Sequence, residues 1–255
     1  MDILDRFIAQ AKENIASGYY AATHLEEGVP YSQVSLKQML LSKPFSLITE
    51  IKHASPAGEY SFDFIDVEKT AFSFKAAGAD AISVVVEPKI FKGNIYHITI
   101  AKKVGLPVLF KDFVFSREQI DAASKVGADA VLLVVKVAER VGSNVNELID
   151  HAHERGLEVL LECYNEKEME FAIKTNADIL GINNRDLQTL KVDITRTKQI
   201  LDCFKSIDKP IISESGIRNK NDVNFIKKTG VKGILVGTAI WKSTNIEEKV
   251  RELKG

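Results

Sequence analysis

The stretch Gly78-Ala79-Asp80-Ala81-Ile82 returns further along the chain as Gly127-Ala128-Asp129-Ala130-Val131, and this repeat decides the fold. A third version is Asn176-Ala177-Asp178-Ile179-Leu180, and Gly230-Val231-Lys232-Gly233-Ile234 is a weaker fourth. Each version stands where a helical pattern ends and a β-branched run begins. The copies recur about every 50 residues, which is the length of two strand–helix units. Four such units predict eight strands.

Short apolar runs bounded by turn signals give the positions of these strands. They are Leu47–Ile51, Ala81–Val86, Val108–Phe110, Ala130–Val135, Glu158–Leu161, Ile179–Ile182, Ile211–Ser213 and Gly233–Val236. Strands that alternate with amphipathic helices indicate a parallel sheet, and closing it removes the edges of an open sheet. A chain of 255 residues has the size of one such barrel. We expect an α/β fold, a (β/α)8 TIM barrel, with an open doubly wound sheet as the alternative.

The first 43 residues precede the barrel strands. We expect residues 1–43 to form an N-terminal helical extension and residues 44–255 the barrel, within one domain at 1–255. The apolar spacing predicts a helix from Ile3 to Ile15 and a short one from Ser35 to Leu41, separated at Gly28-Val29-Pro30. The extension either caps one end of the barrel or contributes to the substrate site.

Composition excludes several classes of protein. The net charge of −1 argues against a nucleic-acid-binding surface, and no apolar run is long enough to cross a membrane. The first residues lack the features of a signal peptide, so a cytoplasmic location is expected. Cys163 and Cys203 form no C-x-x-C pair, and His151 and His153 would not share a helix face, so we expect no metal site. No P-loop or Rossmann fingerprint occurs.

Charged residues end the odd-numbered strands at one common step: Glu50, Lys111, Glu162 and Glu214. Because side chains from alternate strands share a layer inside such a barrel, these four are expected to meet at its C-terminal mouth. Lys52 lies two residues beyond Glu50 and faces the same way. Burying ions costs several kcal/mol each, so this layer is a poor choice for stability. It indicates general acid–base chemistry, with an exposed ring of ion pairs as the alternative.

Glycines follow the last two strands, in Ser215-Gly216 and in Gly237-Thr238. Barrels of this kind often bind phosphate with these two loops, where glycine lets the backbone N–H groups come close to the ligand. Ser55 in the first loop adds a hydroxyl. We therefore expect a small phosphorylated substrate.

These motifs together resemble the indole-3-glycerol phosphate synthase family of tryptophan biosynthesis. The resemblance covers nearly the whole chain. It rests on Glu50-Ile51-Lys52-His53-Ala54-Ser55-Pro56, Lys111-Asp112-Phe113, Gly181-Ile182-Asn183-Asn184-Arg185-Asp186-Leu187 and Ser213-Glu214-Ser215-Gly216-Ile217. It implies a carboxy-lyase that closes the ring of 1-(2-carboxyphenylamino)-1-deoxyribulose 5-phosphate and releases CO2 and water, with no cofactor or metal.

The resemblance also implies roles for individual residues. Lys111 would be the general acid of ring closure and Glu162 the general base. Lys52 would pair with the substrate carboxylate or assist dehydration, and Glu50 would support proton transfer. Asn183 and Arg185 would orient the anthranilate part and the carboxylates, and Glu214 would complete the network. The phosphate would be held by Ser55, Ser215, Gly216, Gly237 and Thr238. How Lys111 and Lys52 divide the proton transfers stays open.

Some positions depart from the family pattern, and two other functions remain as alternatives. The first loop lacks the usual lysine near Gly58, and Phe110 stands where arginine is common. A phosphoribosylanthranilate isomerase-like enzyme would need a Cys/Asp pair, but Cys163 follows Glu162 and should point out of the barrel. A non-catalytic barrel that binds a phosphorylated metabolite has no use for the charged layer. A monomer is the simplest assembly, and other pathway enzymes as partners stay open.

Overall fold

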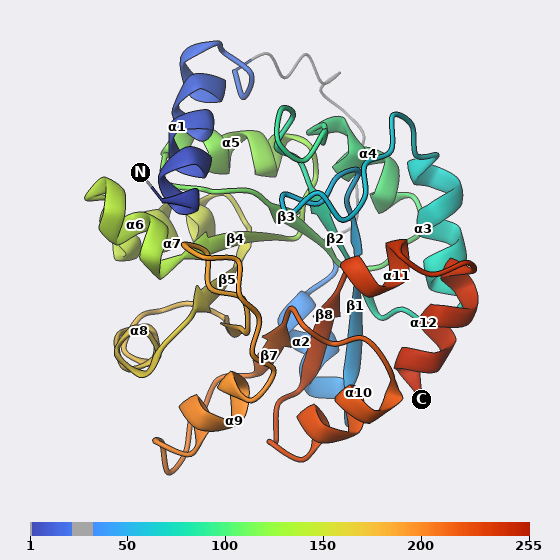
Figure 1. Ribbon diagram of the computed structural model, residues 1–255. Helices are drawn as coiled ribbons and strands as arrows, with labels where there is room; N and C mark the ends of the chain where they lie inside the picture. Colours follow the sequence, from blue (N-terminus) through green and yellow to red (C-terminus); the bar gives the residue numbers. More distant parts are fainter. Residues whose placement is uncertain (1, 22–32) are drawn as a thin grey trace.

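Eight parallel strands form a closed barrel in chain order, with β1 paired to both β2 and β8 (Figure 1). The computed structural model describes residues 2–21 and 33–255. The strands are β1 (Ser46–Ile51), β2 (Ala81–Val85), β3 (Val108–Lys111), β4 (Ala130–Val134), β5 (Glu158–Cys163), β6 (Ile179–Asn183), β7 (Ile211–Glu214) and β8 (Gly233–Val236). The predicted barrel is confirmed, and each predicted strand overlaps an observed one.

Two helices precede the barrel, and the others follow its strands. They are α1 (Ile3–Ala16), α2 (Leu36–Ser42), α3 (Val67–Ala76), α4 (Tyr96–Lys102), α5 (Arg117–Lys125), α6 (Val135–Val141), α7 (Val145–Glu154), α8 (Glu166–Ile173), α9 (Arg196–Leu201), α10 (Lys220–Lys227), α11 (Thr238–Trp241) and α12 (Ile246–Lys254). Short polar residues start many of them: the side chain of Asn165, for example, accepts from the backbone N–H of Glu168 at 2.9 Å. Among the described residues, no helix has the length and apolar character needed to span a bilayer.

Alternation along each strand divides the core into two layers. On β5, Leu161 and Cys163 belong to the outer cluster between strands and helices, whereas Leu160 belongs to the cluster inside the barrel. Successive side chains on a strand point to opposite faces, so Glu162 shares the inner face with Leu160. The predicted outward direction of Cys163 is confirmed.

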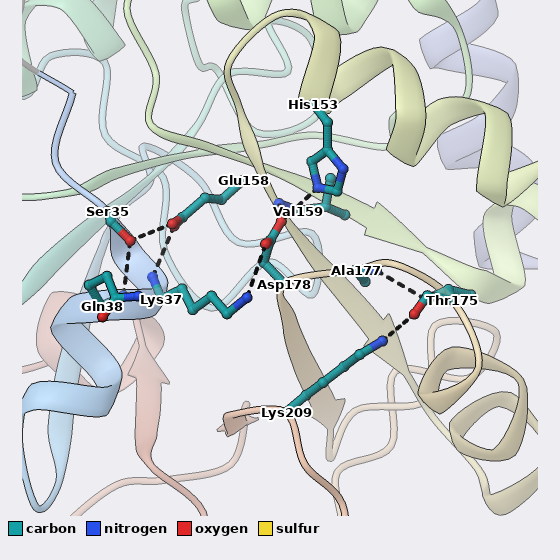
Figure 2. Close-up of polar contacts among 10 residues, drawn as sticks. All are labelled: Ser35, Lys37, Gln38, His153, Glu158, Val159, Thr175, Ala177, Asp178 and Lys209. Carbon is teal, nitrogen blue, oxygen red and sulfur yellow. Dashed lines mark hydrogen bonds and ion pairs between the residues drawn. The ribbon is translucent and has the colours of Figure 1, made fainter.

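The repeated aspartates join neighbouring strands where the strands begin. A carboxylate oxygen of Asp80 accepts the backbone N–H of Leu47 at 2.8 Å, and Asp129 accepts that of Val108 at 2.7 Å. Asp178 does the same for Val159 at 3.0 Å, as Figure 2 shows. Each aspartate therefore ties the start of an odd-numbered strand to the start of the next strand, which explains the sequence repeat.

Helix α2 closes the barrel at the starts of the strands. Leu36 and Leu40 are fully buried in the inner cluster, and a Cβ at Gly233, the first residue of β8, would lie 3.3 Å from Leu40. The hydroxyl of Ser35 donates to Glu158, and the backbone N–H of Lys37 donates to the same carboxylate at 2.9 Å (Figure 2). The prediction that the extension caps one end is confirmed for this helix.

Helix α1 lies at the opposite end, where the strands finish. Asn14 donates to Glu87, just after β2, at 3.0 Å, and the ring of Phe7 stacks on Phe113, just after β3, at 4.8 Å. Both predicted helices exist, with bounds within a residue of those expected. The predicted break at Gly28-Val29-Pro30 lies outside the described residues.

Candidate active site

A pocket opens at the C-terminal ends of the strands, and all twelve predicted site residues line it. They are Glu50, Lys52, Ser55, Lys111, Glu162, Asn183, Arg185, Glu214, Ser215, Gly216, Gly237 and Thr238. They come from different strands and from the loops that follow, and the barrel brings them to one place. The structure shows their position, and their individual roles stay predictions.

Lys111 lies between two buried carboxylates. Its Nζ is 2.9 Å from Oε2 of Glu214 and 3.6 Å from Oε2 of Glu162. Glu162 also accepts a hydrogen bond from Nδ2 of Asn183 at 2.9 Å. This arrangement joins β3, β5, β6 and β7 in one network and fixes the Glu162 carboxylate. The predicted meeting of the odd-strand charges is confirmed for these three.

The remaining two charges form a second pair at the end of β1. Nζ of Lys52 is 2.6 Å from Oε1 of Glu50, and both side chains are largely buried. Trp241 donates from its indole nitrogen to the backbone carbonyl of Glu50 at 2.8 Å, which ties this strand end to α11. The pocket therefore contains two acid–base groups that come from different strands.

Burial and neighbouring charges move the pKa values of these groups in different directions. Burial lowers the pKa of Lys111, but the carboxylates of Glu214 and Glu162 outweigh it and hold this pKa above the usual value. Burial opposes the charge on Glu50 as well, yet Lys52 and Lys111 keep its pKa below the usual value. The ammonium of Lys111 and the carboxylate of Glu50 are thus the stable forms near neutral pH.

Glu214 behaves differently from Glu50. Burial raises its pKa to about 7 against the attraction of Lys111, and the nearby Glu162 carboxylate adds to the rise. Its Oε1 atom is buried and has no hydrogen-bond partner among the described residues. A carboxyl group that changes protonation near neutral pH, with one oxygen unused, is suited to proton transfer or to accepting a substrate donor.

Two glycines leave room for the buried carboxylates. A Cβ at Gly181 would stand 2.5 Å from Oε1 of Glu214, and a Cβ at Gly237 would stand 2.4 Å from Oε1 of Glu50. Any side chain at these positions would displace an acid of the charged layer. Gly181 was not among the predicted site residues, because nothing in its local sequence shows which side chain faces it.

The loop after β7 has an unusual backbone at the predicted phosphate end of the pocket. Ser215 has φ of 67° and Gly216 has φ of 82°, and a left-handed conformation is uncommon for a residue with a side chain. Nδ2 of Asn184 holds the loop by donating to the carbonyl of Ser215 at 3.0 Å. A Cβ at Gly216 would lie 2.6 Å from Val192, so glycine is needed here.

Sequence reasoning missed the apolar wall of the pocket. It is formed by Phe7, Phe91, Phe113, Leu187 and Leu190. The rings of Phe7 and Phe91 lie 5.7 Å apart and complete an aromatic group with Phe113. Through Phe7, α1 contributes to the wall of this pocket, and a part of the extension in the substrate site stays a prediction. The pocket has a flat apolar side, a charged floor and a glycine-rich end.

No group of three His, Cys, Asp or Glu side chains within 2–21 and 33–255 is arranged to hold a metal ion. His151 and His153 each contact an aspartate instead, Asp121 at 2.9 Å and Asp178 at 2.8 Å. Burial raises the pKa of the Cys163 thiol well above its usual value. A thiol of this kind, turned away from the pocket, is a poor acid or nucleophile.

Comparisons with known proteins agree with this geometry. The family model for indole-3-glycerol phosphate synthase matches residues 4–253. A curated relative with that name from Bacillus thuringiensis (strain Al Hakam) is 36% identical over 254 residues, covering 99% of this chain and 98% of the relative. One from Bacillus cereus (strain ATCC 10987 / NRS 248) is 35% identical with the same coverage.

Solved structures show the same fold at lower identity. An N-acetylmannosamine-6-phosphate 2-epimerase from Clostridium perfringens superposes with a TM-score of 0.59 at 18% identity, covering 86% of this chain and 93% of that one. A thiamine phosphate pyrophosphorylase from Pyrococcus furiosus gives a TM-score of 0.58 at 20% identity, covering 84% of this chain and 96% of that one. At such identities the likeness concerns the barrel alone.

Proposed function

Because the chain belongs to the indole-3-glycerol phosphate synthase family, we propose that the two acid–base groups at its barrel mouth divide the proton transfers of that reaction. The enzyme is a carboxy-lyase of tryptophan biosynthesis. It closes the five-membered ring of 1-(2-carboxyphenylamino)-1-deoxyribulose 5-phosphate and releases CO2 and water. The single observation that carries the division is the placement of Lys111 between Glu214 and Glu162.

Ring closure makes a bond between the ring carbon that bears the carboxylate and the ketone carbon of the sugar. Negative charge then develops on the ketone oxygen, and an acid has to meet it. Lys111 supplies this proton, since the carboxylates around it keep it in the ammonium form. Glu162, held by Asn183, is positioned as the base. Glu214 contributes a second carboxyl group beside Lys111.

Dehydration removes the hydroxyl formed from that ketone, together with a proton from the neighbouring carbon. The pair on β1 is suited to this step, because Lys52 carries an acidic proton and Glu50 is held as a carboxylate. An acid and a base 2.6 Å apart also allow the proton to return to Lys52 after turnover. Before decarboxylation, Lys52 pairs with the substrate carboxylate.

Binding uses the two ends of the pocket. The phosphate lies among Ser55, Ser215, Gly216, Gly237 and Thr238, where glycines let the backbone approach it. The anthranilate ring lies against the apolar wall, where the Phe7, Phe91 and Phe113 rings offer stacking surfaces. Arg185 is fixed by its bond to the carbonyl of Leu190 at 3.2 Å and orients the substrate from the side.

Turnover by the wild-type enzyme, compared with Lys111→Ala, tests this division. The assay adds the carboxyphenylamino substrate and follows the rise of indole fluorescence. We expect Lys111→Ala to lose about a hundredfold or more in kcat, since a positioned acid contributes roughly 10² to 10⁴ in rate. Lys174→Ala is the matched control, because this exposed lysine at the end of α8 forms an ion pair only with Glu170 among the described residues.

Each outcome decides a different part of the proposal. Wild-type protein that binds the substrate but releases no indole product would contradict turnover and leave a phosphate-binding barrel. Wild-type turnover with a fully active Lys111→Ala variant would remove Lys111 from the acid role. An isomerase-like activity on a phosphoribosyl substrate has little support, because Cys163 faces away from the pocket.

A further inference from the structure

A second groove adjoins the phosphate end of the pocket and is strongly cationic. It shares Gly216 and Thr238 with the main pocket and continues outward over α11 and the loop after β7. Its lining includes four cationic residues, Arg185, Arg218, Lys242 and Lys249. Glu59 is the single acid among the described residues that line it. A carboxylate placed alone among cations beside an anion site requires an explanation.

Glu59 contacts two groups that a phosphate would use. One carboxylate oxygen, Oε2, accepts the hydroxyl of Ser55 at 3.0 Å, and the other lies 3.8 Å from Nζ of Lys242. Ser55 lines the main pocket, and Lys242 stands four residues after Thr238 on the other side of the phosphate end. The carboxylate therefore connects the first loop to the segment after β8.

We infer that the Glu59 carboxylate is a built-in competitor of the substrate phosphate and sets the affinity of the enzyme for phosphorylated ligands. The inference rests on the proposed phosphate end of the pocket. When the phosphate arrives, the Ser55 hydroxyl and the Lys242 ammonium turn from Glu59 to the phosphate oxygens. Glu59 then moves toward solvent, which its partial exposure of 30% permits.

The contacts of Glu59 are weak enough for this exchange. Lys242 is about half exposed, at 54%, and an ion pair in such a place contributes little to stability. A dianionic phosphate is a stronger acceptor than a single carboxylate and attracts the Lys242 ammonium more strongly. Phosphate binding then includes the free-energy cost of displacing Glu59. The apparent affinity is the affinity of the free site multiplied by the fraction of molecules in which Glu59 has left the site.

Glu59→Ala and Glu59→Gln test the inference, with inorganic phosphate as the probe. The inhibition constant of phosphate and the KM of the substrate are measured for each variant. Both constants should fall about two- to tenfold in Glu59→Ala and less in Glu59→Gln, because the site no longer has to be vacated. Asp63→Asn is the matched control: it removes one acid from the same loop, where Asp63 pairs with Lys92 at 2.9 Å outside the groove.

A second substitution separates competition from mere support. Lys242→Gln should raise both constants, and it should do so more strongly when Glu59 is already alanine, because Lys242 is then free for the phosphate. If Glu59→Ala instead raises both constants, Glu59 holds Lys242 and Ser55 in place for the ligand, and the inference is wrong. Equal changes of the two constants in Glu59→Ala and Asp63→Asn would also overturn the inference, since such changes would reflect the net charge alone.

The proposed function is judged separately. Wild-type protein that neither turns over the substrate nor binds phosphate would remove the phosphate end itself. Wild-type turnover with unchanged constants in Glu59→Ala would remove only the competitor.

Discussion

The wild-type protein should lose stability as the pH rises, and Asp112→Asn should remove the part of this loss that comes from Asp112. Asp112 is buried just after Lys111, and no ion pair involves it among the described residues. Its carboxyl group accepts the Tyr20 hydroxyl at 2.6 Å and the backbone N–H of Phe113 at 2.8 Å. Burial raises its pKa to about 7 despite these two bonds, and the Glu87 carboxylate adds to the rise.

The direction of the pH effect follows from where the proton is held. Between about pH 4 and 7 the folded protein keeps the Asp112 proton while the unfolded chain releases it, so stability falls as the pH rises through this window. A shift of this size gives a loss of about 2.5 kcal/mol from pH 5 to pH 8. Asparagine has the same shape and no charge, and its amide can still meet Tyr20, so the variant should lack this loss.

The assay is urea unfolding at several pH values, followed by the fluorescence of Trp241, the single tryptophan of the chain. Wild type and Asp112→Asn share every other titrating group, including Glu214, so the difference between them isolates Asp112. Tyr20→Phe keeps the acid but removes a hydrogen bond that lowers its pKa, so it should extend the loss of stability to higher pH. Parallel unfolding profiles for wild type and Asp112→Asn would refute the reasoning.

Two further predictions concern stability and binding. Asp129→Asn should cost about 3–5 kcal/mol in urea unfolding, because it breaks the buried ion pair in which the Asp129 carboxylate lies 2.6 Å from the Lys102 ammonium; a loss below about 1 kcal/mol would contradict this. Phe7→Ala should raise the KM of the carboxyphenylamino substrate about tenfold by removing part of the apolar wall, since burying such a ring is worth about 1.5–3 kcal/mol. The exposed Lys12→Ala on the same helix is its control, and equal KM values for the two variants would exclude Phe7 from the binding surface.

The barrel and the charged layer could be predicted because both depend on alternation within single strands. Once Glu50, Lys111, Glu162 and Glu214 occupy the same step of their strands, the period of two places them on the inner face. The repeated aspartates were visible in the sequence as well. Their hydrogen bonds to the start of the preceding strand could not be predicted, because these bonds depend on the register in which neighbouring strands pair.

The apolar wall and Glu59 could not be predicted from local patterns. Which residue of α1 reaches the pocket depends on contacts with distant elements, such as Asn14 with Glu87. Glu59 contacts Lys242 from the far end of the chain, and only the closed barrel brings the two loops together. The catalytic role of each site residue, and the division of the domain at residue 43, stay predictions.

The position of α1 has a consequence for the order of events during synthesis. This helix precedes every strand of the barrel in the chain and is therefore synthesised before them, yet Asp2 pairs with Arg140 and also accepts from Gln188 at 2.6 Å. Contacts between such distant residues form late, because closing a long loop carries an entropy cost before any contact repays it. A nascent chain that ends before β6 lacks part of the docking surface of α1, so the apolar wall is among the last parts completed.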